Sequence, residues 1–192
     1  INFSLYHRYT TDVIERISTY ENNVNINRPE NIGTNRSTGL EMNGKYTPNK
    51  ILSFNGDINF NFFDRQGLYE GTSFDFSSDQ WSGKLTGKVK LSADLEFEIT
   101  GQYRSSYVTV QGEVSDNAFA DIGFRKKIMK GRGVFNLSVR DIFASRIQES
   151  YADQPEFYVY NFSQRGRFIT FGFSYGFGKG EAMEYSGQRR RH

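Results

Sequence analysis

The chain has 192 residues, a formal net charge of +2 and 36% hydrophobic residues. This length suits one domain or a piece of a larger one. The small net charge gives no indication of a nucleic-acid partner. The sequence has no cysteine, which excludes disulfides and thiolate metal sites. No apolar run reaches the ~18 residues of a transmembrane helix, which excludes that class of membrane protein.

Aromatic residues are unusually frequent for so polar a chain, at 18 Phe and 12 Tyr. Glycine is also common, with 19 residues, whereas only 3 prolines occur. This composition favours many strands joined by polar loops, with aromatic side chains gathered on selected surfaces. Alternation is already present at Ile1-Asn2-Phe3, without an initiator Met or signal peptide, so we expect a fragment.

The first half of the chain contains alternating stretches at residues 2–9, 40–46 and 52–62. An alternation of period two predicts a β-strand with two different faces. The first strand is expected to continue to Ile17, and turns are predicted at 21–23 and 47–50. One face of the third stretch is entirely polar, which no protein core would accept: Ser53, Asn55, Asp57, Asn59, Asn61. Residues 64–79 are predicted to form a long polar loop.

The next two stretches, 81–91 and 95–103, predict a hairpin around Ser92-Ala93-Asp94. If Leu91 lies opposite Leu95, Lys90 faces Glu96 and Lys88 faces Glu98, so charges pair by sign across the strands. The favoured interpretation is an ion-pair ladder on the lumen wall of a barrel, and the alternative is a translocation path. The residues of this predicted ladder are Lys84, Lys88, Lys90, Glu96 and Glu98.

The last part of the chain predicts strands at 118–125 and 135–139, and a final one within 166–178. In the final strand, large apolar side chains alternate with small ones such as Gly172 and Ser174. The small face suits a crowded or water-filled lumen, and the large face suits lipid. The large side chains near its end are Phe171, Phe173, Tyr175 and Phe177.

These stretches add up to about eight strands, in which short connections near 48, 93 and 131 alternate with long ones near 22, 70, 113 and 153. That pattern is typical of an all-β, antiparallel transmembrane β-barrel with short periplasmic turns and long extracellular loops. Residues 1–178 are therefore predicted to be an outer-membrane barrel segment, and residues 179–192 a hydrophilic periplasmic tail. Aromatic girdle positions are expected at Tyr46, Trp81, Tyr103 and Tyr107.

Two alternatives remain open on the pattern alone. A soluble ligand-binding β-barrel would also alternate, and it predicts Phe54, Phe60, Phe97 and Phe171 buried inside, whereas the membrane hypothesis places them outside. A structural or adhesive outer-membrane barrel without transport would carry the same strands. Catalysis has little support, because the only histidines are His7 and His192. We expect no enzyme activity, no cofactor and no metal site.

Three segments resemble the C-terminal barrel portion of TonB-dependent receptors, especially the Bacteroidota outer-membrane β-barrel family. They are Tyr9-Thr10-Thr11-Asp12-Val13-Ile14, Asn31-Ile32-Gly33 with Ser37-Thr38-Gly39-Leu40-Glu41, and the aromatic end of the last strand. In such proteins a final strand of this kind resembles the signal that the barrel-assembly machinery reads. The resemblance implies the outer membrane of a Gram-negative bacterium and a barrel of ~22 strands around a plug.

The resemblance further implies energy-coupled import of a bulky nutrient, such as a siderophore, glycan or peptide. Contact with the TonB complex would run through a plug that these residues do not include. The other expected partners are outer-membrane lipid, the barrel-assembly machinery and a surface lipoprotein, with no nucleic acid. Substrate recognition is expected in the long loops, above all in residues 64–79.

Overall fold

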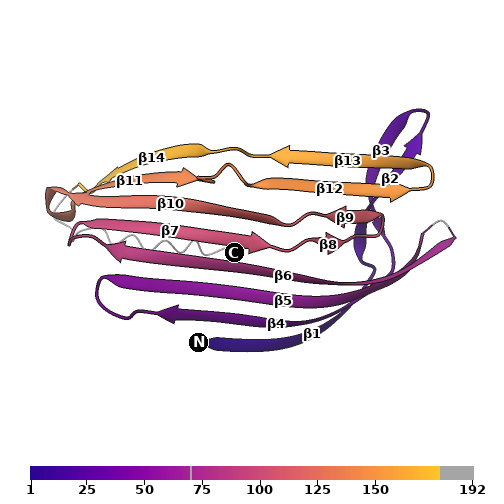
Figure 1. The fold of residues 1–192 in the computed structure, drawn as a ribbon, viewed down its shortest axis with the longest axis horizontal. Coiled ribbons are helices and arrows are strands. Elements are labelled where there is room, and N and C mark those ends of the chain that lie inside the picture. Colours follow the sequence, from indigo (N-terminus) through magenta and orange to yellow (C-terminus); the bar gives the residue numbers. More distant parts are fainter. Residues whose placement is uncertain (70, 178–192) are drawn as a thin grey trace.

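The structure is a computed structural model, and it describes residues 1–69 and 71–177. Its main feature is an eight-stranded antiparallel sheet, whose strands lie side by side in the order in which they occur along the chain (Figure 1). Other strands of the chain lie outside this sheet. The strands of this sheet, in spatial order, are β1 (Asn2–Thr11), β4 (Thr34–Tyr46), β5 (Leu52–Tyr69), β6 (Thr72–Lys90), β7 (Leu95–Arg104), β10 (Asn117–Ile128), β11 (Gly133–Arg140) and β14 (Phe168–Tyr175). These correspond to the eight predicted strands.

The connections at one end of the main sheet contain further strands. β2 (Ile14–Glu21) and β3 (Val24–Asn31) form a hairpin between β1 and β4. A second sheet has the order β13-β12-β9-β8, with β8 (Tyr107–Val108), β9 (Gly112–Val114), β12 (Ile147–Gln154) and β13 (Phe157–Gln164). The described residues hold fourteen strands. The number exceeds the eight predicted because segments predicted as long loops near 22, 113 and 153 contain strands of their own.

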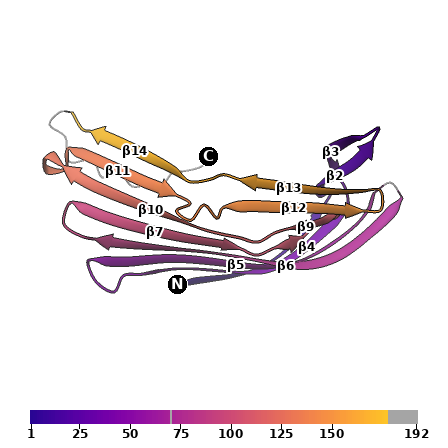
Figure 2. The same ribbon diagram turned by 45° about the horizontal axis from the view of Figure 1, so that its top comes forward.

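The predicted loop at 64–79 is wrong, because β5 and β6 stay paired from Leu52↔Val89 up to Tyr69↔Thr72. Beyond residue 62 the large side chains move to the face that is polar lower in the sheet. Phe63 lies there, 3% exposed, with its ring edge-on to Phe76 at 6.4 Å between centroids. Both views show the ends of β5 and β6 bending toward the β2–β3 hairpin (Figures 1 and 2), and Arg65 forms a salt bridge with Glu15 of β2.

Local sequence explains the turns between these strands. Asn22 and Asn23 both have positive φ, 49° and 67°, which is the conformation of a tight type I′ hairpin and one that asparagine tolerates. The turn after β4 is held by Asn49, whose Oδ1 accepts hydrogen bonds from the backbone of Ile51 and Leu52, both at 2.8 Å. The predicted turns at 21–23 and 47–50 are therefore present.

The predicted register of the β6–β7 hairpin is confirmed. Lys88 lies opposite Glu98 and Lys90 opposite Glu96. The Leu91 amide donates to the Leu95 carbonyl at 2.9 Å, which closes the hairpin where the sequence placed it.

The sheet has no conventional hydrophobic core among the described residues. Only Ile17, Phe63 and Val134 are buried hydrophobic side chains there. Of the four phenylalanines that separate the two barrel hypotheses, Phe54, Phe60 and Phe171 are exposed, by 37%, 44% and 64%, and Phe97 is half-buried. No helix in the described part of the chain is long and apolar enough to cross a membrane.

Candidate functional site

The registers of neighbouring strands give the main sheet two continuous and chemically different faces. Side chains that lie opposite one another across strands share a face. One such row is apolar through six strands: Leu52, Val89, Phe97, Phe124, Leu137 and Phe171. The row next to it is polar or small: Ser53, Lys88, Glu98, Gly123, Ser138 and Thr170. The apolar row lies on what we call the outer face, and the polar row on the inner face.

Aromatic pairs on the outer face bridge neighbouring strands. Phe97 and Phe124 lie 4.9 Å apart between ring centroids, and Trp81 and Tyr103 lie 4.5 Å apart. Of the predicted girdle residues, Trp81 and Tyr103 thus sit together, at the end of the sheet that carries the extra strands. Tyr46 lies at the other end, beside the short turn after β4, and Tyr107 lies in β8. Their role as a membrane girdle stays a prediction.

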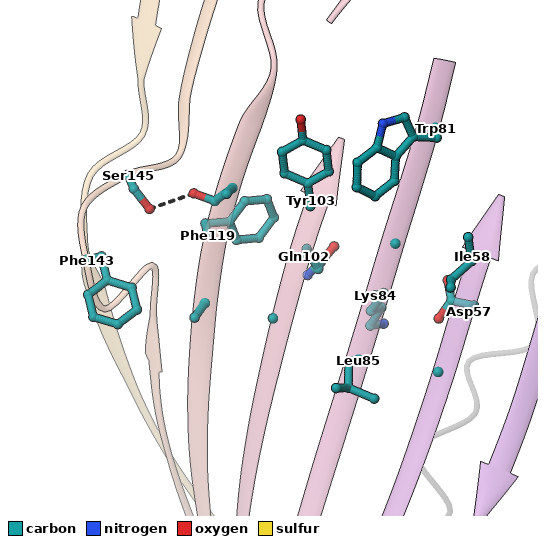
Figure 3. Close-up of a pocket in the computed structure, with 15 residues that line it drawn as sticks. Asp57, Ile58, Trp81, Lys84, Leu85, Gln102, Tyr103, Phe119, Phe143 and Ser145 are labelled. Carbon is teal, nitrogen blue, oxygen red and sulfur yellow. Dashed lines mark hydrogen bonds between the residues drawn. The ribbon is translucent and has the colours of Figure 1, made fainter. Parts of the chain in front are cut away.

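A groove of about 790 Å³ lies on the outer face (Figure 3). Small residues of four neighbouring strands leave it open, and larger side chains such as Trp81, Leu85 and Phe143 surround it. The small residues are Gly56, Gly83, Gly101, Ala118 and Ala120. The connection after β11 closes one side, because Ser145 Oγ donates a hydrogen bond to the Ala118 carbonyl at 2.7 Å.

The inner face contains a polar pocket of about 280 Å³, which we call the basic pocket. Its sides come from β5, β6, β7 and β10 and from the chain at 146–148 and 163–165. Four cationic side chains line it against the single carboxylate of Asp57: Lys84, Arg104, Arg146 and Arg165. None of these four forms an ion pair with another residue that the structure describes.

A second polar pocket, of about 300 Å³, lies further along the same strands and shares Lys84 and Gln102 with the basic pocket. It is lined by both signs of charge, with Glu98 and Asp121 beside Lys84 and Arg140. Its acidic groups have partners: Lys88 Nζ lies 2.8 Å from Glu98 Oε2, and Asp121 Oδ1 accepts a hydrogen bond from the Asp141 amide at 2.8 Å.

The predicted ladder residues all lie on the inner face, but not as one uniform ladder. Lys88 and Lys90 lie opposite glutamates, whereas Lys84 lies opposite Gln102 on one side and Asp57 on the other. Sequence reasoning named none of Arg104, Arg146 and Arg165 as site residues. Alternation in the stretch from Leu95 onward does place Arg104 on the polar face. Nothing in the sequence indicated that the connections around Arg146 and Arg165 return to that face.

A hydrogen-bonded cluster holds the extra strands together at the end of the sheet. Gln111 accepts a bond from the Ser18 amide at 2.8 Å and donates one to the Ser18 carbonyl at 2.9 Å, so its side chain pairs with β2 as a backbone would. Burial raises the pKa of Glu15, although the Arg65 guanidinium opposes that shift. A hydrogen bond to Glu113 raises the pKa of Tyr151 in the same region.

The predicted terminal strand is shorter than expected. β14 ends at Tyr175, so Phe171 and Phe173 lie within it, whereas Phe177 lies two residues beyond its end and is 90% exposed. The chain before β14 is not continuous with it, because β13 ends at Gln164 and β14 begins at Phe168. Gly166, which has a φ of 72°, lies between them. The predicted tail at 179–192 lies outside the described residues.

Among the described residues, no three His, Asp or Glu side chains are grouped as metal ligands. His7 lies on the outer face, with its Nδ1 2.8 Å from Thr38 Oγ1.

Comparison with known proteins places this two-faced sheet in a family. Neither the search of curated proteins nor that of solved structures found a match. The model of a family described as "Outer membrane protein beta-barrel family" matches residues 1–175, which include the whole of the main sheet. The apolar outer face and polar inner face are what a barrel wall between lipid and lumen requires. The chain therefore belongs to this outer membrane protein β-barrel family, and its place is the outer membrane.

Proposed function

We propose that this chain is part of the barrel wall of a TonB-dependent transporter, which imports a bulky nutrient such as a siderophore, glycan or peptide. The observation that carries the proposal is the inner face, where charged side chains line two adjoining polar pockets along β6, β7 and β10. The resemblance of the segments at 9–14 and 31–41 to TonB-dependent receptors supports the same conclusion.

The edges of the sheet support a wide barrel. Among the described residues, β1 pairs only with β4, and β14 pairs only with β11. Backbone groups without partners cost several kcal/mol each in hydrocarbon, so both edges need a further partner. Closing eight strands on themselves leaves an interior just wide enough for side chains. The cations of the basic pocket would then lose water without gaining ion pairs, whereas a wider lumen keeps them hydrated.

The remaining assignments follow from this proposal. Energy would reach the transporter from the TonB complex through a plug inside the barrel. The barrel-assembly machinery would insert the protein, and a surface lipoprotein is a further candidate partner. We assign no catalytic role to any residue.

Uptake in living cells tests the proposal. Cells with and without the intact gene are compared for accumulation of labelled siderophores, oligosaccharides and peptides, with and without a protonophore. The proposal expects at least one compound whose uptake needs both the gene and the proton gradient. Gene-dependent uptake that is unchanged by the protonophore would contradict energy coupling. Loss of surface attachment with no change in uptake would indicate an adhesive barrel instead.

A further inference from the structure

The basic pocket gathers four cationic side chains and one carboxylate at one place on the inner face. Further along β6 and β7, Lys88 is paired with Glu98 at 2.8 Å. In the basic pocket, four cations share the carboxylate of Asp57, and none makes an ion pair with a described residue. Like charges held close together repel, so such a cluster favours an anion among them.

The position of Arg146 in this pocket is fixed by the chain around it. The carboxylate of Asp141, 2% exposed, accepts hydrogen bonds from the amides of Ser145 at 2.9 Å and Arg146 at 3.0 Å. The Arg146 guanidinium lies 4.5 Å from the ring centroid of Phe119, which also lines the pocket. Backbone and side chain are thus both held in place before any ligand arrives, which lowers the entropy cost of binding.

We propose that the basic pocket binds an anionic group of the imported nutrient, a carboxylate or a phosphate, on a soluble molecule. One part of this inference rests on the proposed function, namely that the anion belongs to the imported nutrient. Arg104, Arg146 and Arg165 supply the forked donors that hold such oxygens in pairs, and Lys84 adds a point charge. A volume of about 280 Å³ is roughly that of nine water molecules at ~30 Å³ each. That space fits a group the size of citrate or pyrophosphate.

The acidic side chains of the second polar pocket are held by other groups. Glu98 is occupied by Lys88, and Asp121 by the backbone of Asp141. The outer face is not a route for lipid phosphates to this pocket, because Arg104 and Lys84 alternate with the outer-face residues Tyr103 and Leu85. A soluble anion that enters the lumen is therefore the ligand that this geometry favours.

Calorimetric titration of the intact, detergent-purified protein with citrate and with pyrophosphate tests the proposal. We expect both to bind at low ionic strength and more weakly at high salt. The double variant Arg104→Gln/Arg165→Gln should weaken binding by about tenfold or more, since each removes a charge-assisted contact. The variant Arg104→Lys/Arg165→Lys keeps both charges but loses the forked donors, so its affinity should fall between those of the wild type and the glutamine variant.

A matched control removes two charges from the same face outside the pocket, in Arg8→Gln/Lys45→Gln, and should bind as the wild type does. Heat-dependent gel mobility shows that each variant is folded. The proposal fails if wild type binds neither anion, if the Arg104/Arg165 glutamine variant binds as tightly as wild type, or if the control loses equally. If the nutrient that the cells import carries no anionic group, the transport proposal is supported and the proposal for the basic pocket is contradicted.

Discussion

Tyr6 covers Gly39 across the β1–β4 pair on the inner face, so the glycine has no room for a side chain. A β-carbon at Gly39 would overlap the Tyr6 ring and come within 2.6 Å of the Phe60 carbonyl oxygen. An aromatic ring laid over a strand glycine restores the packing that the glycine lacks. This contact ties the edge strand β1 to the rest of the sheet.

Gly39→Ala should therefore destabilise the barrel, by about 1–3 kcal/mol, because Tyr6 must move and β1 loses its packing. Urea unfolding of the intact protein in lipid vesicles measures the change. Gly101→Ala is the control, since a β-carbon there would meet nothing within 4 Å. Equal losses in the two variants would show that strand glycine itself, rather than the Tyr6 contact, sets the effect.

Glu15 gives the β2–β3 hairpin a pH dependence. Its pKa is raised above the usual value near 4.5, mainly by burial. A raised pKa means that the folded state favours the protonated acid, so this stability is fully present below the usual pKa and is lost as pH rises through the raised one. We expect hydrogen exchange in residues 14–31, corrected for intrinsic rates, to be slower at mildly acidic than at alkaline pH.

The variant Glu15→Gln should abolish this pH dependence and leave the hairpin no more mobile at neutral pH than in the wild type. The reason is that glutamine keeps a hydrogen-bond acceptor for Arg65 without burying a charge. Unchanged pH dependence in the variant would assign the effect to another group.

At the scale of elements, Gln111 connects strands that are far apart in the chain. Its two hydrogen bonds to Ser18 join the β9 region to β2. Gln111→Ala should speed hydrogen exchange in β2 and β3 and leave the main sheet unchanged, because only the hairpin loses partners.

Gln154→Ala is the matched control for Gln111→Ala. The Gln154 side chain donates to the Gln111 carbonyl at 3.2 Å, so its loss touches the same residue without touching β2. Exchange in β2 that is as fast in Gln154→Ala as in Gln111→Ala would contradict the assigned role of the Gln111 side chain.

Elements differed in how well the sequence predicted them. Strands such as 52–62 and 95–103 were predictable because each has one consistently apolar face, and the turn residues between hairpins are local signals. The prediction of a loop at 64–79 was wrong. Phe63, Phe74 and Phe76 lie on the inner face, which is polar in the rest of β5 and β6. These side chains pack on each other and near the β2–β3 hairpin, a long-range effect that alternation alone does not contain.

The whole molecule is defined by its two faces, and these are open to direct measurement. Spin labels on Phe97→Cys and Glu98→Cys in a lipid bilayer should report oxygen accessibility at 97 and access of a water-soluble relaxant at 98. Adjacent strand residues point to opposite sides, so each position is the control for the other. Burial at 97 with solvent exposure at 98 would contradict a lipid-facing outer side.

The candidate site was only partly predictable at this scale. Lys84, Lys88 and Glu98 could be placed on the inner face because they lie in regularly alternating strands. Arg146 and Arg165 could not, since their positions depend on where the β11–β14 connection folds back. A pocket whose lining runs from Asp57 to Arg165 arises from tertiary packing, which local periodicity does not encode.

The length of the β5–β6 hairpin has a consequence for the cell surface. The two strands have 18 and 19 residues, whereas ~9–11 residues are enough to cross the membrane. The surplus lies at the end opposite the short turns, which in such barrels is the outside of the cell. We therefore expect this end of the hairpin to be the part that antibodies and bacteriophages reach first. Immune and phage selection would act there first, and the outward-facing residues of this tip could change under it without disturbing the strands in the bilayer.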